Sequence, residues 1–185
     1  IIPATGICVD KDKNNKCDDC SAELAFEINR NGELLYYDNP YIQGFQALYD
    51  AAQDGDVITL LRDVFAYTIE IRKELTYDLN GFNIITASSR SINIYDNVTI
   101  RDSVGGGEIH LAVYIGAPCT IEGGMFYSLG VDSGITLDSI LSPCAGYYDY
   151  KGNAIDTTGK KSITDVYVIE KHTEGDIYNC LGYKC

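Results

Sequence analysis

The chain has 185 residues, of which 45% are hydrophobic, and a formal net charge of −13. This length suits one domain with a small appendage. Such an acidic surface repels phosphate, so we expect neither nucleic-acid binding nor attraction to anionic lipid. No apolar run approaches the roughly 20 residues of a membrane helix, so we expect no membrane insertion by this segment. Many strand-forming residues, 15 tyrosines and 18 glycines indicate a β-rich protein with many turns.

Residues 1–23 are polar and cysteine-bearing, and we interpret them as an irregular loop segment. Oxygen donors alternate along this segment, as they do in the first nine positions of an EF-hand-type calcium loop. The expected calcium ligands are the side chains of Asp10, Asp12, Asn14 and Asp18 and the backbone carbonyl of Lys16. A solvated polar turn without an ion is the alternative.

Two positions of this loop decide how well it matches the calcium pattern. The sixth needs a left-handed backbone, and Asn15 is the most tolerant residue after glycine. The twelfth usually holds a bidentate Glu, but here it is Ser21, so Asp19 or Glu23 would have to replace that ligand.

Seven cysteines make complete pairing within the chain impossible. Around the calcium-type loop, Cys8, Cys17 and Cys20 fit either a disulfide that closes the loop or three ligands of a zinc site. A fourth zinc ligand would come from a C-terminal tail, 171–185, which holds His172, Cys180 and Cys185. For these three residues, a Cys180–Cys185 bridge, half of a metal knuckle and free thiols remain open.

The segment from Leu24 to Leu60 contains local sequence signals of a hairpin, a helix and a strand. "LAFEINRNGELLYYD" contains two strand-like runs around Asn31-Gly32, which favours a type I′ hairpin turn. Apolar residues at Phe45 and Leu48 then recur with a helical period, which predicts a short amphipathic helix over about 43–53. "VITLLRDV" follows as a strand.

Beyond Val64 a loose repeat of short strands and turns begins. The units start at residues 75, 98, 119 and 135, each with Thr at its second position, an acidic residue two or three positions after the Thr, and Gly or Asn-Gly at the turns. This spacing suits a parallel β-solenoid whose units stack on one another. An antiparallel sandwich is the alternative. We therefore predict an all-β fold over 24–170, a short right-handed parallel β-helix capped by the helix, with irregular cysteine-bearing tails.

Two stretches carry a resemblance to known families. The segment "YYDNPYIQGFQALYDAAQDGDVITLLRDVFAYTIEIRKELTYDLNGFNI" resembles the start of right-handed parallel β-helix (pectin-lyase-like) domains of bacterial surface proteins, through Ala47 to Leu60 and Leu75 to Gly81. The N-terminal segment is similar to the D-x-D-x-N-x-x-C-D-x-C modules of secreted proteins from Gram-positive anaerobes. The resemblance implies an extracellular location on a bacterial surface.

Catalytic signals are weak. Five carboxylates at comparable positions of the repeat could line a groove, although each is more simply an outward residue that ends a strand: Asp78, Asp96, Asp102, Glu122 and Asp138. His110 stands alone between apolar neighbours. Cys119 and Cys144 each follow a proline, and we expect buried thiols in neighbouring turns, with a bridge as the alternative. We therefore expect no catalytic residues.

Exposed tyrosines offer a binding role instead. Tyr147, Tyr148 and Tyr150 lie close to Asp and Asn, a combination that suits sugar recognition, unless the rings pack over a loop. We expect 149–165 to protrude as a loop and "VYVIEK" to form the last strand.

The leading hypothesis is a non-catalytic adhesion or glycan-binding module that contacts a glycan or a host or cell-wall component. A polysaccharide-degrading enzyme and a rigid stalk are the alternatives. Because the chain begins at Ile1 and ends at Cys185, we expect it to be a piece of a longer protein.

Overall fold

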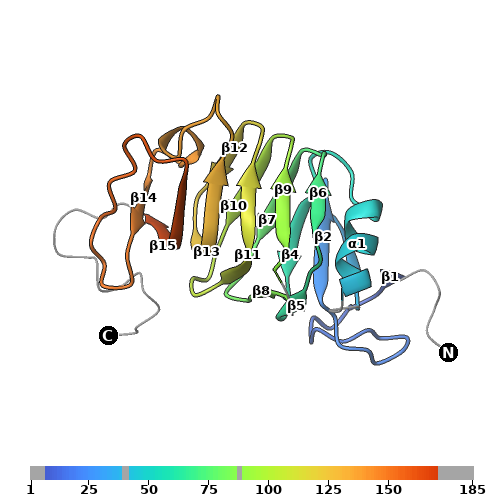
Figure 1. Ribbon diagram of the computed structural model, residues 1–185. Coiled ribbons are helices and arrows are strands. Elements are labelled where there is room, and N and C mark those ends of the chain that lie inside the picture. Colours follow the sequence, from blue (N-terminus) through green and yellow to red (C-terminus); the bar gives the residue numbers. More distant parts are fainter. Residues whose placement is uncertain (1–6, 39–41, 87–88, 171–185) are drawn as a thin grey trace.

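The fold is a parallel β-solenoid, and the expected all-β class is confirmed. The computed structural model describes residues 7–38, 42–86 and 89–170 (Figure 1). We call one turn of the solenoid a rung. The strands of successive rungs are β4 (Val57–Leu60), β5 (Val64–Phe65) and β6 (Ile69–Ile71); β7 (Leu75–Asp78), β8 (Ile84–Ile85) and β9 (Ser91–Ile94); β10 (Val98–Arg101) and β11 (Glu108–Ile115); and β12 (Cys119–Ile121) and β13 (Gly124–Val131).

The sequence repeat coincides with the stacking of the rungs. Thr76, Thr99 and Thr120 pair in register across β7, β10 and β12, all in parallel. Their neighbours in the strands alternate, so that Tyr77, Ile100 and Ile121 point into a continuous apolar core. The period-two pattern and the spacing of about 20 residues thus have one origin, because each rung must present its apolar side chains at the same height as its neighbours.

The fourth predicted unit, 135–142, is not a strand. It forms a 3₁₀ helix, η1 (Asp138–Ile140), and only Leu141 makes a parallel bridge, to Ile121. Hydroxyl groups compete locally with strand pairing here. Ser139 exchanges hydrogen bonds with Thr136, whose hydroxyl oxygen accepts the Ser139 N–H at 3.2 Å. The regular repeat therefore ends after β13.

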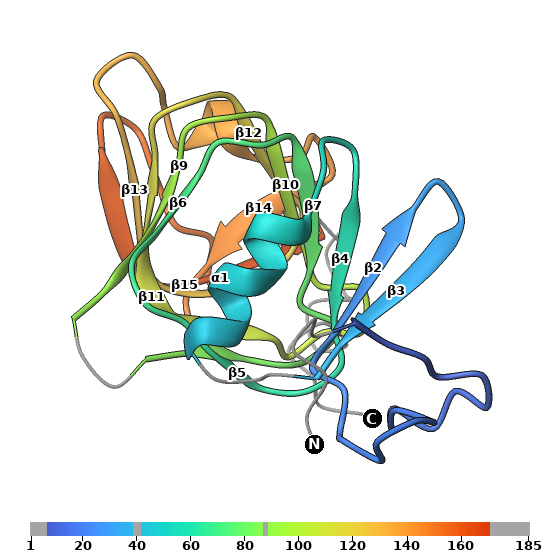
Figure 2. The same ribbon diagram turned by 90° about the vertical axis from the view of Figure 1, so that its right-hand side faces the viewer.

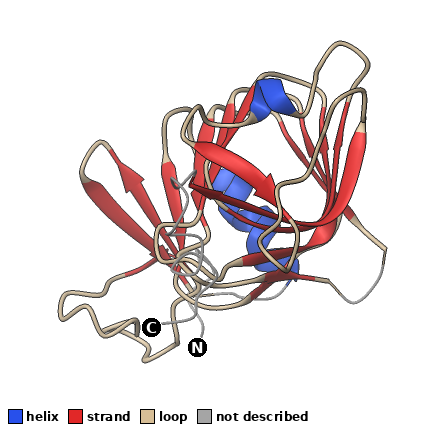
Figure 3. Ribbon diagram, turned by 90° about the vertical axis from the view of Figure 1, so that its left-hand side faces the viewer, coloured by secondary structure: helices blue, strands red, loops and turns tan. Residues whose placement is uncertain are grey.

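The C-terminal end of the solenoid is closed by antiparallel strands. β15 (Ser162–Glu170) pairs antiparallel with β13 on one side and with β14 (Ala145–Tyr148) on the other. β14 runs across the opening (Figure 3). The last strand was predicted in "VYVIEK", but it begins four residues earlier, at Ser162. This pairing covers the edge that β13 would otherwise expose.

At the N-terminal end, β2 (Phe26–Arg30) and β3 (Glu33–Tyr37) form the predicted hairpin. Asn31 and Gly32 both have positive φ, 51° and 92°, as a type I′ turn requires. β2 pairs antiparallel with β4, and β1 (Ile7–Cys8) pairs with β3, so the hairpin extends the sheet beyond the first rung. It projects to one side of the solenoid (Figure 2).

The predicted cap is helix α1 (Ile42–Ala51), which lies across the open first rung (Figure 2). Phe45 and Leu48 are buried against the core. Lys73 satisfies the carbonyl groups at the end of the helix, where Nζ donates to the oxygens of Tyr49 and Ala52 at 2.6 and 2.8 Å. The cap is therefore joined to the solenoid by both apolar packing and a charged hydrogen-bond donor.

A second tie connects the hairpin to the first rung. The guanidinium of Arg30 donates from Nε and Nη2 to the two carboxylate oxygens of Asp56, at 3.0 and 2.7 Å. Asp56 is buried, and it also accepts the backbone N–H of Gln53. This two-pronged geometry stabilises the charge of a carboxylate that would otherwise be costly to bury.

Candidate metal centre in the N-terminal loop

The N-terminal loop connects β1 to β2 and folds back on itself. Asp18 donates its N–H to the carbonyl of Val9 at 2.8 Å, and Leu24 donates to the carbonyl of Asn15 at 2.9 Å. Asn15 adopts φ +61°, the left-handed conformation predicted for this position of a calcium-type loop. These contacts bring the two ends of the loop together. The loop contains two groups of ligand atoms, which come from neighbouring residues in the sequence.

The first group is acidic. Carboxylate oxygens of Asp10, Asp12 and Asp18 lie within 4.8 Å of one another. The Asp10 carboxylate is buried and accepts the N–H groups of Asn14 and Asn15 at 3.1 and 2.9 Å. Three converging carboxylates in so small a volume form a hard-oxygen donor set of the kind that Ca²⁺ prefers. The residues present therefore fit a cation.

Asn14 and Glu23, which were also considered as calcium ligands, make hydrogen bonds to other groups. The Asn14 side-chain oxygen accepts the Lys16 N–H at 2.8 Å, so it closes a turn of the loop. Glu23, considered as a substitute for the missing twelfth ligand, instead accepts a hydrogen bond from Arg62 at 2.6 Å. Of the predicted ligands, the structure thus groups Asp10, Asp12 and Asp18 into a cluster.

The second group consists of thiols. Sulfur atoms of Cys8, Cys17 and Cys20 lie within 4.8 Å of one another, and all three residues are free thiols. Cys8 and Cys17 are buried in a small apolar cluster with Leu24 and Tyr36. The sequence left a disulfide and a metal site open for these residues, and the structure brings all three thiols together without a disulfide.

The thiols differ in their electrostatic surroundings. Burial, reinforced by the neighbouring Cys17, raises the pKa of Cys8 well above its ordinary value. Burial also acts to raise the pKa of Cys17, but hydrogen bonds from the backbone of Val9, Asp19 and Cys20 and from the Cys8 side chain lower it to about 7. Cys17 is thus the thiol that these hydrogen bonds favour as a thiolate.

The remaining cysteines do not join this group. Cys119 is buried in β12 as expected, and burial raises its pKa to about 12. Cys144 was expected to be buried as well, but it is exposed. It lies in a turn closed by a hydrogen bond from Ala145 to Ser142, so its side chain is not part of a rung. His172, Cys180 and Cys185 lie outside the described residues.

The repeat carboxylates are not aligned as a catalytic row. Asp78 stands opposite Arg101 in register, and its carboxylate accepts hydrogen bonds from Arg101 Nε at 2.9 Å and from the N–H groups of Asn80 and Ser103, both at 3.0 Å. Burial alone would raise the pKa of Asp78, but the hydrogen bonds from Ser103, Arg101 and Asn80 outweigh it and lower the pKa. The carboxylate therefore stays charged and serves the turns between rungs.

Two further repeat carboxylates also have structural partners. Asp102 accepts the N–H groups of Gly81 and Gly107 at 2.8 and 2.7 Å, which ties the corners of two rungs together. Asp138 accepts the hydroxyl of Thr157 at 2.6 Å. These contacts agree with the simpler interpretation of the carboxylates as residues that end strands. His110 is exposed and contacts Glu108 on the same strand at 2.7 Å.

The predicted tyrosine group separates in the structure. Tyr147 is buried, and its hydroxyl donates to the carbonyl of Leu137 at 2.7 Å, so it is not available to a ligand. Its ring faces the core because β14 crosses the open end of the solenoid. Tyr148 is half-buried. Tyr150 is 70% exposed, with the ammonium group of Lys151 5.2 Å from its ring centroid.

A different pair of tyrosines lies on the outer face of the sheet. Tyr95 and Tyr114 are exposed at 37% and 38%. Tyr114 is in register with Asn93 on one side and Gly130 on the other. Sequence reasoning missed this pair, although the alternation in "EIHLAVYI" marks position 114 as outward.

Polar groups surround both rings, and we call Arg72, Asn93, Tyr95, Tyr114 and Asp132 the tyrosine face. The Arg72 guanidinium lies 4.5 Å from the Tyr95 ring centroid. The pKa of Tyr114 is raised by partial burial and by the neighbouring carboxylate of Asp132. Each ring lies beside a glycine of the next rung: a Cβ on Gly116 would come within 2.9 Å of Tyr95, and one on Gly130 within 3.7 Å of Tyr114. The glycines thus leave room for the rings to pack against the backbone of the next rung.

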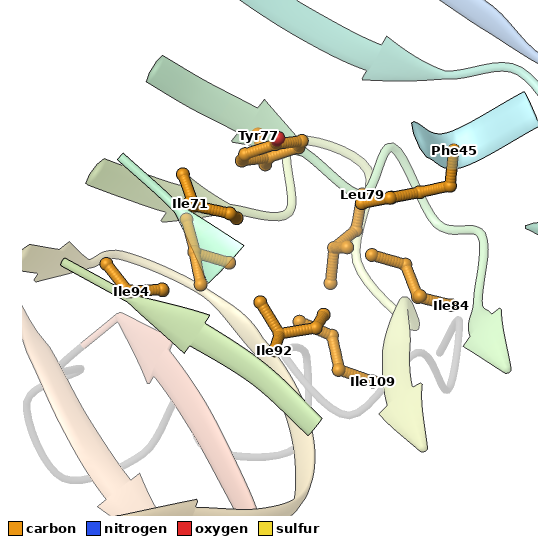
Figure 4. A pocket seen from close by; sticks show the side chains of 9 residues that line it. Phe45, Ile71, Tyr77, Leu79, Ile84, Ile92, Ile94 and Ile109 are labelled. Atoms are coloured by element: carbon orange, nitrogen blue, oxygen red, sulfur yellow. The ribbon is translucent and has the colours of Figure 1, made fainter. Parts of the chain in front are cut away.

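The core contains a small apolar cavity beneath the helical cap. Its lining includes Phe45, Tyr77, Leu79 and several isoleucines (Figure 4). A cavity of about 10 Å³ has room for about one water molecule. It is far too small for a sugar or an organic cofactor.

Comparisons with family models, with curated proteins and with solved structures each found no match. Among the described residues, no helix combines the length and apolar character needed to span a bilayer.

Proposed function

We propose that this chain is a non-catalytic binding module of a bacterial surface protein, that its tyrosine face binds a glycan, and that a calcium ion stabilises its N-terminal loop. The observation that carries the proposal is the placement of Tyr95 and Tyr114, with Arg72, Asn93 and Asp132 beside them, on the rigid outer face of a parallel sheet. Aromatic faces stack on pyranose rings, and the surrounding amide and charged groups bind hydroxyls.

The chemistry of the carboxylates favours binding over catalysis. A general acid needs a raised pKa and an open position next to a substrate. Asp78 has a lowered pKa and is engaged by three donors within the turns, and Asp102 is engaged by two backbone N–H groups. These groups stabilise the fold, and a lyase or hydrolase mechanism would require other residues.

Two cation chemistries suit the N-terminal loop, one for each ligand group. Ca²⁺ suits the oxygen ligands Asp10, Asp12 and Asp18, where it would relieve the mutual repulsion of three carboxylates and fix the loop against β1. Zn²⁺ suits the thiols instead, because thiolates are soft ligands. Both ions would have a structural role. Their ligands lie in the N-terminal loop, apart from the tyrosine face.

A glycan array probed with the intact chain and with Tyr114→Ser tests the binding role. We expect the intact chain to bind a defined set of glycans and Tyr114→Ser to lose at least about tenfold in affinity, equivalent to ~1.4 kcal/mol. Tyr150→Ser is the matched control, because Tyr150 is exposed but lies outside the tyrosine face.

Three results would contradict the proposal. Loss of binding in Tyr150→Ser but not in Tyr114→Ser would move the site to the loop after β14. Release of reducing ends or unsaturated products from any bound polysaccharide would show an enzyme. Absence of binding to every glycan on the array would favour the alternative of a rigid stalk, for which stacked rungs are mechanically suited.

A further inference from the structure

The thiol cluster draws its members from two separate parts of the chain. Cys8 lies in β1, where it is opposite Tyr36 of β3, and Cys17 and Cys20 come from a tight turn. That turn is closed by a hydrogen bond of 2.7 Å from the Ser21 N–H to the Cys17 carbonyl. Strand pairing and the turn therefore both contribute to the convergence of the three sulfur atoms.

Neither a disulfide nor simple hydrophobic packing accounts for three converging thiols. One disulfide uses two sulfurs and leaves the third beside it. Packing alone would bury all three, but Cys20 is exposed while Cys8 and Cys17 are buried. Three sulfur atoms within 4.8 Å of one another are instead the arrangement that a thiolate metal site requires.

We propose that Cys8, Cys17 and Cys20 bind one thiophilic divalent ion, Zn²⁺, through three thiolates, with the fourth position open to solvent on the Cys20 side. Sulfurs 2.3 Å from a tetrahedral ion lie about 3.8 Å apart. Atoms already within 4.8 Å of one another reach that geometry by small side-chain rotations. This site is separate from the glycan and calcium sites of the proposed function.

The adjacent acidic cluster does not compete for the same ion. Cys17 and Asp18 are neighbours, yet their side chains belong to different ligand groups. Hard Ca²⁺ selects carboxylate oxygen, and soft thiolates select Zn²⁺. The loop therefore separates two cations by ligand chemistry, and excess Ca²⁺ leaves the thiol site unoccupied.

The test is a Co²⁺ titration of the reduced full chain without oxygen, followed by thiolate-to-cobalt charge-transfer absorption. We expect saturation at one Co²⁺ per chain through this site, displacement by Zn²⁺ and no displacement by excess Ca²⁺. Cys20→Ser should weaken Co²⁺ binding by at least about tenfold. Because Cys20 is exposed, this variant should fold, and circular dichroism checks that it does.

Two controls separate this site from the other cysteines. Cys144→Ser removes an exposed thiol outside the cluster, and Cys180→Ser/Cys185→Ser removes both C-terminal thiols. Both should keep the charge-transfer band and its affinity. The proposal is overturned if the reduced chain gives no band, if Cys20→Ser binds Co²⁺ as tightly as the unaltered chain, or if the double variant alone loses the band.

Discussion

The ring of Phe45 on helix α1 lies nearly parallel to the ring of Tyr77 on β7, with centroids 6.0 Å apart and an interplanar angle of 10°. Through this stack the cap reaches the core of the second rung, beside the small cavity. Tyr77 is fully buried, and no described protein group lies within hydrogen-bond reach of its hydroxyl. Desolvation accordingly raises the pKa of Tyr77 far above its ordinary value.

Removal of this hydroxyl should not weaken the fold. We expect Tyr77→Phe to leave the free energy of unfolding unchanged or to raise it by about 1 kcal/mol, because an unpaired buried hydroxyl is costly. The matched control is Tyr147→Phe, which loses the hydrogen bond to Leu137 and should lower the free energy of unfolding by about 1 kcal/mol. Urea denaturation measures both, and equal losses in the two variants would contradict this account.

Lys73→Met should weaken the attachment of the cap to the solenoid. Its ammonium group donates to three carbonyls at the end of α1 and lies 4.5 Å from the Tyr49 ring centroid. We expect a loss of about 1–3 kcal/mol in urea denaturation, because hydrogen bonds to charged groups are the stronger ones. Lys160→Met, at an exposed lysine far from the helix, is the control and should change stability by less than about 0.5 kcal/mol. A similar loss in both variants would refute the capping role.

Asp78 should make the fold sensitive to acid. Its pKa is lower in the folded chain than in the unfolded chain, so its stabilising contribution is complete above the unfolded value, near 3.8, and is lost as the pH falls toward the folded value. We expect the urea midpoint of Asp78→Asn to fall at pH 7 and to vary less than that of the unaltered chain between pH 5 and 3. Glu122→Gln, an exposed carboxylate at the same corner, is the control. An unchanged pH profile in Asp78→Asn would contradict the assignment.

Gly107 marks a place where two rungs touch. A Cβ at this position would lie 2.7 Å from the Leu79 Cβ and 2.9 Å from the Phe82 carbonyl oxygen. We expect Gly107→Ala to cost about 1–3 kcal/mol, because a backbone contact cannot rotate away. Gly134→Ala, where nothing lies within 4 Å, should be close to neutral. Thermal denaturation of the two variants tests this prediction. An unchanged stability of Gly107→Ala would show that the rungs can separate there.

Calcium binding by the acidic cluster is tested by calorimetry on the intact chain and on Asp12→Ala. Asp12 is exposed, so its replacement should spare the fold while it removes one of three converging carboxylates. We expect measurable Ca²⁺ heat from the intact chain and at least about a tenfold loss of affinity in the variant. Asp54→Ala, an exposed aspartate outside the cluster, should bind normally. Absence of heat from the intact chain would refute the site.

The sequence by itself determined those features whose causes are local or periodic. Asn31-Gly32 specified the hairpin, because both positions tolerate positive φ. Asn15 specified the left-handed position of the acidic loop for the same reason. The apolar alternation and the spacing of the Thr76, Thr99 and Thr120 units specified parallel stacking, because a slip of one residue would turn the apolar side chains outward.

Only the tertiary structure decided the features that depend on contacts between distant segments. Whether Tyr147 is exposed depends on the path of β14 across the open end, and whether Cys144 is buried depends on where the repeat stops. Tyr114 joins Asn93 and Asp132 through strand pairing and the turn beyond β13. Cys8 meets Cys17 and Cys20 because β1 pairs with β3 and the loop then folds back, so that the Asp18 N–H donates to the Val9 carbonyl. A sequence pattern records which face a residue prefers, but its neighbours across a sheet are set by register and closure.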